Sequence, residues 1–242
     1  MEKLSVEEIL LEQRGLAYEN LWATIFHDTI VGSRWLQNQP FSPGRMAIGY
    51  PTLYALYRIL DEFQPKSILE MGLGQSTKMI GSYVKWKVSQ NDECHHIIVE
   101  HDKLWIDFFT NSYELSSGTE VVQFDLRKVE FDDPEGGKTE VNMYSGFSER
   151  LKDQKFDLIF IDGPLGSPIY SRVDIIDLIP ECLNDSFILM LDDAERQGEQ
   201  NTLTMTRNLM KECGIGHWLN YYIGQKSTAI ITSPDLHFYG TM

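Results

Sequence analysis

After Pro65, short apolar segments alternate with segments of helical character, and this alternation limits the possible folds more than any other feature of the chain. Strands this apolar need cover on both faces, which crossover helices provide in a parallel sheet. We therefore expect an α/β fold with a doubly wound, Rossmann-like sheet. The expected strands are 67–71, 96–99, 120–124, 156–161, 187–191, 218–223 and 228–232, and the expected helices lie near 76–87, 103–115, 145–153, 171–182 and 199–213.

Two antiparallel hairpins are expected beside the parallel strands. Only Gly224-Gln225-Lys226-Ser227 separates the last two strands, which is typical of a hairpin connection. The acidic, glycine-bearing segment 132–137 is expected at the tip of a second, inserted hairpin. The sheet is thus predicted to be mostly parallel, with a C-terminal antiparallel hairpin.

The first 64 residues carry helical signals. Apolar residues recur at about helical spacing over 4–38, which predicts one or two helices, and a Pro/Gly-bearing loop is expected at 39–45. A further helix is expected over 51–63, with Pro51 in its first turn. No internal repeat or linker divides the chain, so we expect an N-terminal helical cap at 1–64 in the same domain as the Rossmann-like core at 65–242.

A glycine-bearing turn joins the first strand to the next helix and reads Glu70-Met71-Gly72-Leu73-Gly74-Gln75-Ser76-Thr77. It is expected at the carboxyl edge of a central strand, where ligands bind in open α/β sheets. Its glycines permit positive φ angles and a close approach of the ligand to the backbone. A dinucleotide fingerprint needs a third glycine where Thr77 stands, which disfavours a pyrophosphate ligand. The carboxylate of Glu70 instead suits the ammonium of an amino-acid moiety, held through turn amides or water.

The order acid, any residue, Gly, any residue, Gly at this turn resembles the first motif of the class I S-adenosylmethionine-dependent methyltransferases, and the resemblance covers residues 44–233. In that family an acid at the end of the next strand accepts hydrogen bonds from both ribose hydroxyls, and Glu100 matches it. A carboxylate suits this task because it presents two acceptor oxygens. The alternative is that Glu70 and Glu100 are ordinary strand-end charges. The resemblance implies S-adenosyl-L-methionine as the cofactor, bound by Glu70, Gly72, Gly74, Ser76, Thr77, Glu100, His101, Tyr144 and Asp162.

Two of these residues have specific expected places. His101 is expected beside the ribose. Tyr144 is expected in the adenine pocket, with packing in the core as the alternative.

Three carboxylates follow two strands that are neighbours in a doubly wound sheet. Asp162 follows the strand 156–161, and Asp192 and Asp193 follow the strand 187–191. Close carboxylates repel unless a proton or a cation joins them, and a hard divalent ion such as Mg²⁺ prefers oxygen ligands. We therefore expect these three acids to be catalytic and to bind Mg²⁺ or another divalent cation. The alternative is that Asp162 orients the substrate and that Asp192 or Asp193 caps the helix beginning near Ala194.

This acidic edge is similar to that of the catechol O-methyltransferases and, through Asp162-Gly163-Pro164, to that of the glucuronic-acid O-methyltransferases. The resemblance implies O-methylation of a hydroxyl group on a small molecule or a glycan, with a metal that lowers the pKa of the hydroxyl. Two positions depart from the catechol enzymes. Asp193 stands where they have an amide, and Leu165 stands where they have a lysine base. Asp162 is therefore the first candidate for the base, ahead of His101.

Three arginines are candidates for binding the acceptor. Arg172 and Arg196 follow the acidic strand ends, and Arg45 lies in the Pro/Gly-bearing loop. A guanidinium group binds a carboxylate or phosphate through two contacts, so these residues favour an acceptor such as a uronic acid or a sugar phosphate. The alternative is that they form surface ion pairs.

The composition limits the cellular setting. Lysine and arginine total 21 against 36 acidic residues, a net charge of -15 that argues against a nucleic-acid partner. Three cysteines without paired spacing are expected as free thiols in a reducing compartment. The N-terminus does not resemble a signal peptide, and no apolar run is long enough to cross a bilayer. We expect a cytoplasmic protein without a membrane partner. The sequence does not define the oligomeric state, although the apolar N-terminal helices are of a kind that often dimerises and leave a homodimer open.

Two other functions suit the same fold. One is a different transferase, such as an aminopropyltransferase, or a nicotinamide-dependent enzyme, although the missing third glycine disfavours the nicotinamide enzyme. The other is a non-catalytic S-adenosylmethionine-binding protein, which the presence of all three strand-end acids disfavours.

Overall fold

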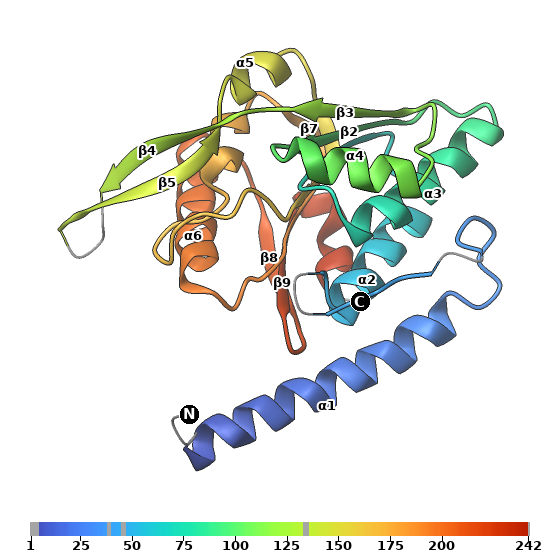
Figure 1. The fold of residues 1–242 in the computed structure, drawn as a ribbon, viewed down its shortest axis with the longest axis horizontal. Coiled ribbons are helices and arrows are strands. Elements are labelled where there is room, and N and C mark those ends of the chain that lie inside the picture. Colours follow the sequence, from blue (N-terminus) through green and yellow to red (C-terminus); the bar gives the residue numbers. More distant parts are fainter. Residues whose placement is uncertain (1–4, 38–39, 45–46, 133–135, 242) are drawn as a thin grey trace.

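The computed structural model describes residues 5–37, 40–44, 47–132 and 136–241. Its centre is a seven-stranded sheet with the strand order β3-β2-β1-β6-β7-β9-β8 (Figure 1). The strands β1, β2, β3, β6 and β7 are parallel, and β9 runs antiparallel to both β7 and β8. This order confirms the predicted doubly wound, mostly parallel sheet with its C-terminal hairpin. The strands are β1 Ser67–Met71, β2 His95–Glu100, β3 Thr119–Gln123, β6 Phe156–Ile161, β7 Leu183–Leu191, β8 Trp218–Ile223 and β9 Ser227–Thr232.

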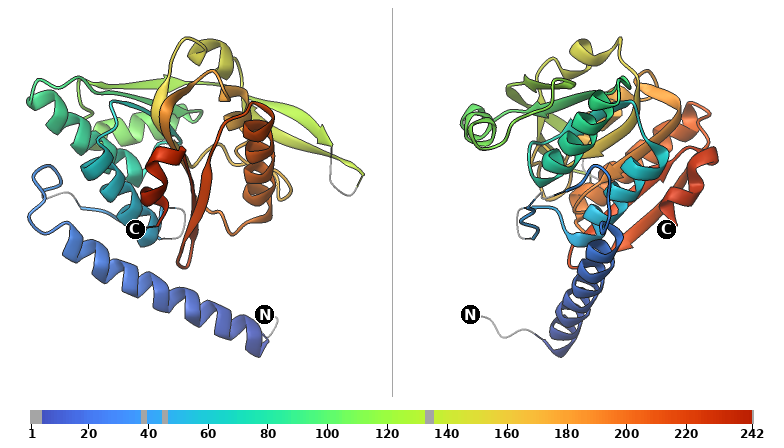
Figure 2. Two further views of the ribbon diagram at one scale, coloured as in Figure 1. Left: turned by 180° about the vertical axis from the view of Figure 1, so that it is seen from behind. Right: turned by 90° about the vertical axis from the view of Figure 1, so that its right-hand side faces the viewer.

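Successive residues of the central strands pack into two separate cores, one on each face of the sheet. Ile68, Leu158 and Ile188 pack against α2 and α3 on one face. Leu69 and Ile159 pack against α5, α6 and the 3-10 turn η2 on the other face. Figures 1 and 2 show these helical layers on the two sides of the sheet. The helices are α2 Tyr50–Arg58, α3 Gln75–Ser89, α4 Lys103–Ser112, α5 Phe147–Leu151, α6 Gln197–Glu212 and η2 Val173–Leu178.

The inserted hairpin is present as a separate two-stranded sheet, formed by β4 (Leu126–Asp132) and β5 (Lys138–Tyr144). It extends from the body of the protein beside the loop that follows β6 (Figure 1). The Tyr170 hydroxyl of that loop donates a hydrogen bond to the Asp132 carbonyl oxygen at 3.1 Å. The middle of the predicted tip, 133–135, lies outside the described residues.

The N-terminal segment forms one long helix, α1 (Val6–Thr29), which projects from the body over much of its length (Figures 1 and 2). Its C-terminal half is attached to the site-bearing elements. Trp22 Nε1 donates to the Ile223 carbonyl at 2.9 Å, and the Glu19 carboxylate accepts from the amides of Tyr50 and Gln225 at 2.6 and 3.1 Å. These contacts join the start of α2 to the hairpin β8–β9. Among the described residues, no helix combines the length and apolar character that crossing a bilayer requires.

One expected helix changes its hydrogen-bond pattern in its last turn, and another is shorter than the sequence pattern predicts. The helix expected at 51–63 is α2 followed by a π-helical turn, η1 (Ile59–Phe63). The helix expected at 171–182 is only the 3-10 turn η2. Arg172 directly before this turn has a left-handed backbone, with φ of 59°, and Ile179 after it is extended. Pro180 explains this end, because the residue before a proline is disfavoured in the α conformation.

Candidate functional site

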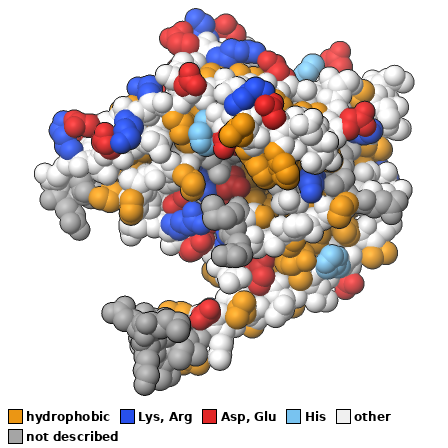
Figure 3. All heavy atoms as spheres, viewed as in Figure 1, with side chains coloured by type: hydrophobic (Ala, Val, Ile, Leu, Met, Phe, Trp, Pro, Cys, Tyr) orange, Lys and Arg blue, Asp and Glu red, His pale blue; other side chains and the backbone are white. Residues whose placement is uncertain are grey.

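A cavity of about 450 Å³ opens at the carboxyl ends of β1, β2, β6 and β7. One end is lined by Gly72, Gly74, Glu100 and His101, and the other by the polar residues that follow β6 and β7. Acidic and basic side chains meet in the hollow between α4 and the hairpin β4–β5 (Figure 3). The predicted glycine turn and the predicted acidic edge therefore line the same cavity, which is of the size that small-molecule ligands occupy.

The glycine turn has a backbone that requires glycine at its first position. Gly72 has φ of 101°, and a Cβ atom there would lie 3.1 Å from the carbonyl carbon and oxygen of Asp162. Its amide donates to the Val99 carbonyl at 2.8 Å. The Gly74 amide donates to the Thr77 hydroxyl at 2.9 Å, so Thr77 supports the turn from the first turn of α3. Gly72 and Gly74 both line the cavity.

Glu70, Ser76 and Thr77 lie beneath this turn, where they are buried and do not line the cavity. The Ser76 hydroxyl donates to Glu70 Oε1 at 2.5 Å, and His96 Nε2 lies 3.0 Å from Glu70 Oε2. The Glu70 carboxylate is thus bound by protein groups. It fixes the start of α3 and shapes the turn from below, and any effect of Glu70 on a cofactor ammonium passes through the turn.

Glu100 lies at the wall of the cavity and is bonded to the glycine turn. Its Oε2 atom accepts from the Leu73 amide at 3.2 Å. Its Oε1 atom accepts from the amides of His101 and Asp102 at 2.7 and 3.0 Å, and His101 Nδ1 lies 2.8 Å from the same oxygen. The structure therefore brings together the two parts of the expected cofactor site, and it places His101 directly beside Glu100.

Trp105 is a cavity residue that the sequence pattern did not reveal. It belongs to α4, and its Nε1 atom donates to the Leu73 carbonyl at 2.7 Å. Its ring stacks on that of Phe108, which is largely exposed. The sequence pattern predicted only a helix near 103–115, because the position of the glycine turn relative to α4 depends on the tertiary fold.

Tyr144, at the end of β5, packs in the core and also reaches the cavity, and its place in an adenine pocket stays a prediction. It is almost completely buried against Phe124 and Phe147, and it also lines the cavity. Burial raises the pKa of its phenol well above the ordinary value. The Tyr144 amide donates to Asp174 Oδ1 at 2.7 Å, so the turn η2 fixes the end of the hairpin at the cavity.

Asp174 is expected to make stability fall as the pH rises. Burial is the main cause that raises the pKa of its carboxyl group to about 7, and its Oδ2 atom has no hydrogen-bond partner. A folded-state pKa above the unfolded value of about 3.9 means that the stabilisation is complete below pH 4 and is lost as the pH rises through 7. The loss is at most about 4 kcal/mol, at 1.36 kcal/mol for each pKa unit.

The variant Asp174→Asn should remove this loss. Its free energy of unfolding, measured with urea at pH 5 and pH 8, should change less with pH than that of the native protein. Asp185→Asn, at an exposed carboxylate, is the matched control. An equal pH dependence in Asp174→Asn and the native protein would show that folding does not raise the pKa of Asp174.

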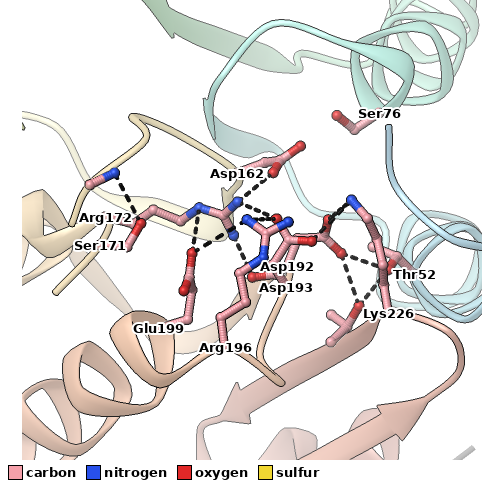
Figure 4. Close-up of polar contacts among 12 residues, drawn as sticks. Thr52, Ser76, Asp162, Ser171, Arg172, Asp192, Asp193, Arg196, Glu199 and Lys226 are labelled. Atoms are coloured by element: carbon pink, nitrogen blue, oxygen red, sulfur yellow. Dashed lines mark hydrogen bonds and ion pairs between the residues drawn. The ribbon is translucent and has the colours of Figure 1, made fainter. Parts of the chain in front are cut away.

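The acidic edge is organised around a buried guanidinium group (Figure 4). Arg172 is only 1% exposed, and its Nη2 atom donates to Asp162 Oδ1 at 2.9 Å and to Asp193 Oδ2 at 2.7 Å. Its Nη1 atom donates to the Asp192 carbonyl, and its Nε atom lies 3.7 Å from Glu199. Arg172 lines the cavity, as expected for a residue near the acceptor, but its guanidinium group is hydrogen-bonded to the protein's own acids, and its contact with an acceptor stays a prediction.

The three predicted acids have different surroundings. Asp162 and Asp193 line the cavity, whereas Asp192 is fully buried and accepts hydrogen bonds at Oδ1 from the hydroxyls of Thr52 and Thr228. Burial is the main cause that raises the pKa of Asp162 to about 8 and that of Asp192 to about 6. Burial acts in the same direction on Asp193, but Arg172 and Lys226 outweigh it and lower the pKa of that carboxyl.

Two further cations approach this group of acids from the cavity. Arg196 is partly exposed, and its Nη1 atom lies 2.9 Å from Asp193 Oδ2. Lys226, at the tip of the hairpin β8–β9, lies 3.0 Å from Asp193 Oδ1 through its Nζ atom. Sequence reasoning missed Lys226, because only the strand order places β9 next to β7 and brings this tip to the acidic edge. Arg45, the third predicted arginine, lies outside the described residues.

The charges of this group do not fit a divalent cation. Asp162, Asp192 and Asp193 each offer an oxygen within 4.8 Å of the others, as a metal site would require. Arg172 and Lys226, however, already bring two positive charges into the group from opposite sides (Figure 4). A metal ion would have to be placed beside these cations, which repel it.

Comparison with known proteins yields similarities of fold only. No protein-family model matches the chain, and no curated protein matches its sequence. One similar solved structure is the plantazolicin methyltransferase BpumL in complex with SAH, at 11% identity and a TM-score of 0.40, covering 76% of this chain and 81% of that one. Another is a methyltransferase from Pyrococcus furiosus, at 14% identity and a TM-score of 0.44, covering 89% and 98%. A third is the spermidine synthase from Thermotoga maritima, at 12% identity and a TM-score of 0.43, covering 76% and 58%.

Proposed function

We propose that this chain is a class I S-adenosylmethionine-dependent methyltransferase. The observation that carries the proposal is the hydrogen bond between Glu100 Oε2 and the Leu73 amide, which holds a carboxylate beside Gly72 and Gly74 at one cavity wall. A carboxylate here offers acceptors for the two hydroxyls of a ribose. The glycines leave room for the amino-acid portion of the cofactor against the backbone. Trp105 and Tyr144 supply aromatic surface in the same cavity.

We propose further that the reaction is O-methylation of a hydroxyl group on a small molecule or a glycan. The cofactor, when bound, supplies a methyl group activated on a sulfonium. The task of the protein is to position the acceptor and to remove its proton. Asp162 faces the cavity, and burial raises the pKa of its carboxyl group to about 8, so its ionised form is a competent proton acceptor near neutral pH.

The acceptor end of the cavity favours an anionic substrate such as an acidic sugar. Arg196 lines the cavity with its side chain 42% exposed, which leaves it accessible to a carboxylate or a phosphate. We place the protein in the cytoplasm, with a small-molecule or glycan acceptor and no nucleic-acid or membrane partner. The net charge of -15 and the free cysteines support this setting.

The test is isothermal titration calorimetry with S-adenosylhomocysteine, S-adenosylmethionine, decarboxylated S-adenosylmethionine and NAD on the native protein. We expect one molecule of S-adenosylhomocysteine to bind per chain and NAD to give no heat. Preference for the decarboxylated cofactor would replace this proposal with an aminopropyltransferase. Binding of S-adenosylhomocysteine without methyl transfer to any of a panel of uronic acids, phenols and sugar phosphates would favour a non-catalytic binding protein.

A further inference from the structure

The carboxylates at the acidic end of the cavity are contacted by a nearly equal number of cationic side chains. The carboxylates are those of Asp162, Asp192, Asp193 and Glu199, and the cations that contact them are Arg172, Arg196 and Lys226. Arg172 and Glu199 are 1% and 3% exposed, so these charges interact in a poorly solvated region. One proton is sufficient to make the group neutral. A divalent cation added to it would leave an excess of positive charge inside the protein.

The carboxylate oxygens divide into those already hydrogen-bonded and those that face Lys226. Asp162 Oδ1 and Asp193 Oδ2 accept from Arg172, and Asp192 Oδ1 accepts from two threonine hydroxyls. Asp192 Oδ2 and Asp193 Oδ1 are buried and accept no hydrogen bond from the described residues. Both face Lys226 Nζ, at 3.9 and 3.0 Å. The ammonium group therefore lies where a cation shared by Asp192 and Asp193 would lie.

Lys226 is also open to the cavity. Its side chain is 12% exposed and lines the wall together with Asp162 and Arg196 (Figure 4). An ammonium group has three N–H donors, so it can hold Asp192 and Asp193 and still donate to a ligand. A positive charge beside a hydroxyl oxygen stabilises the ionised form of that hydroxyl, as a bound metal ion does.

We infer that the Lys226 ammonium group takes the place and the task of a divalent cation. It joins Asp192 to Asp193 and donates a hydrogen bond to the acceptor oxygen, so that catalysis requires no metal. The second half of this inference, the contact with the acceptor, rests on the proposed methyltransferase function. The first half, the occupied cation position, is independent of it.

Replacing Lys226 should create a metal site that the native protein lacks. Lys226→Met keeps most of the side-chain volume and removes the charge, and Lys226→Arg keeps the charge. Lys128→Met is the matched control, because Lys128 forms a comparable ion pair with Glu140 at 2.9 Å on the exposed hairpin. The probe is Mn²⁺, followed by electron paramagnetic resonance. Thermal denaturation establishes that each variant is folded.

We expect Lys226→Met to bind Mn²⁺ roughly 10- to 100-fold more tightly than the native protein, because one close positive charge is removed. The native protein, Lys226→Arg and Lys128→Met should bind it equally weakly. Folded Lys226→Met without this gain would overturn the inference, as would tight Mn²⁺ binding by the native protein that Asp192→Asn abolishes.

A second measurement separates this inference from the proposed function. Binding of S-adenosylhomocysteine by the native protein should be unchanged by EDTA, as should methyl transfer to an accepted hydroxyl. Activity that EDTA removes and Mg²⁺ restores would refute metal independence while supporting the methyltransferase. Absence of S-adenosylhomocysteine binding would refute the proposed function, and the Mn²⁺ result would still decide whether Lys226 occupies the cation position.

Discussion

Glu100→Gln should weaken the binding of S-adenosylhomocysteine roughly 100-fold or more, because hydrogen bonds to a charged group contribute about 1.5–3 kcal/mol each. The Glu100 carboxylate already accepts from the amides of Leu73, His101 and Asp102, and it faces the cavity. An amide in its place has one acceptor oxygen and an NH₂ group that opposes the backbone donors. Isothermal titration calorimetry with S-adenosylhomocysteine measures the loss.

Glu120→Gln is the control for this experiment. Glu120 is in the adjacent strand β3 and forms an exposed ion pair with Arg150 at 2.8 Å. Its replacement removes the same charge outside the cavity and should leave the affinity unchanged. If Glu100→Gln is folded and binds S-adenosylhomocysteine as tightly as Glu120→Gln, the ribose site proposed at the end of β2 is wrong.

Arg172→Met should lower the free energy of unfolding by about 3–5 kcal/mol, the usual cost of leaving a buried ion pair without one partner. The guanidinium group is the shared partner of Asp162, Asp193 and Glu199, and it is almost completely enclosed. For a chain of this length the melting temperature should fall by roughly 10 °C. Urea unfolding and calorimetry measure both quantities.

Two further variants show whether the loss of stability in Arg172→Met arises because the buried acids are left without their cation. Arg150→Met removes an exposed arginine from its ion pair with Glu120, and it should cost less than about 1 kcal/mol. Adding Asp193→Asn to Arg172→Met removes one of the stranded charges and should restore part of the stability. A loss in Arg172→Met no greater than that in Arg150→Met would mean that the acidic group does not depend on this cation.

The sequence predicted the features that depend on local pattern and on the geometry of parallel sheets. The apolar strands predicted a mostly parallel sheet that is covered by helices on both faces. Because successive parallel strands end at the same edge, Glu100 was expected beside the turn at Gly72, and the hydrogen bond from Leu73 confirms that they are adjacent. The hairpin β4–β5 was predicted from the acidic, glycine-bearing segment at its tip.

Features that depend on the burial of charged side chains were not predictable in this way. The segment around Arg172 resembles a helix start with a surface arginine. Its left-handed backbone and its three acidic partners arise only when β6 and β7 are side by side. Lys226 likewise resembles an ordinary residue of a hairpin turn. Glu70 was expected to act on the cofactor through the turn, and only the tertiary fold shows that Ser76 and His96 bind its carboxylate beneath that turn.

The position of β9 between β7 and β8 has a consequence for the biosynthesis of the protein. Lys226 and Thr228, which contact the acids after β7, belong to the part of the chain around β9, which leaves the ribosome after the other members of this group. Until that part is inserted into the sheet, Asp192 and Asp193 lack these partners. The nascent protein can therefore form its glycine turn early, but the acidic end of its cavity is completed only after β9 has been synthesised.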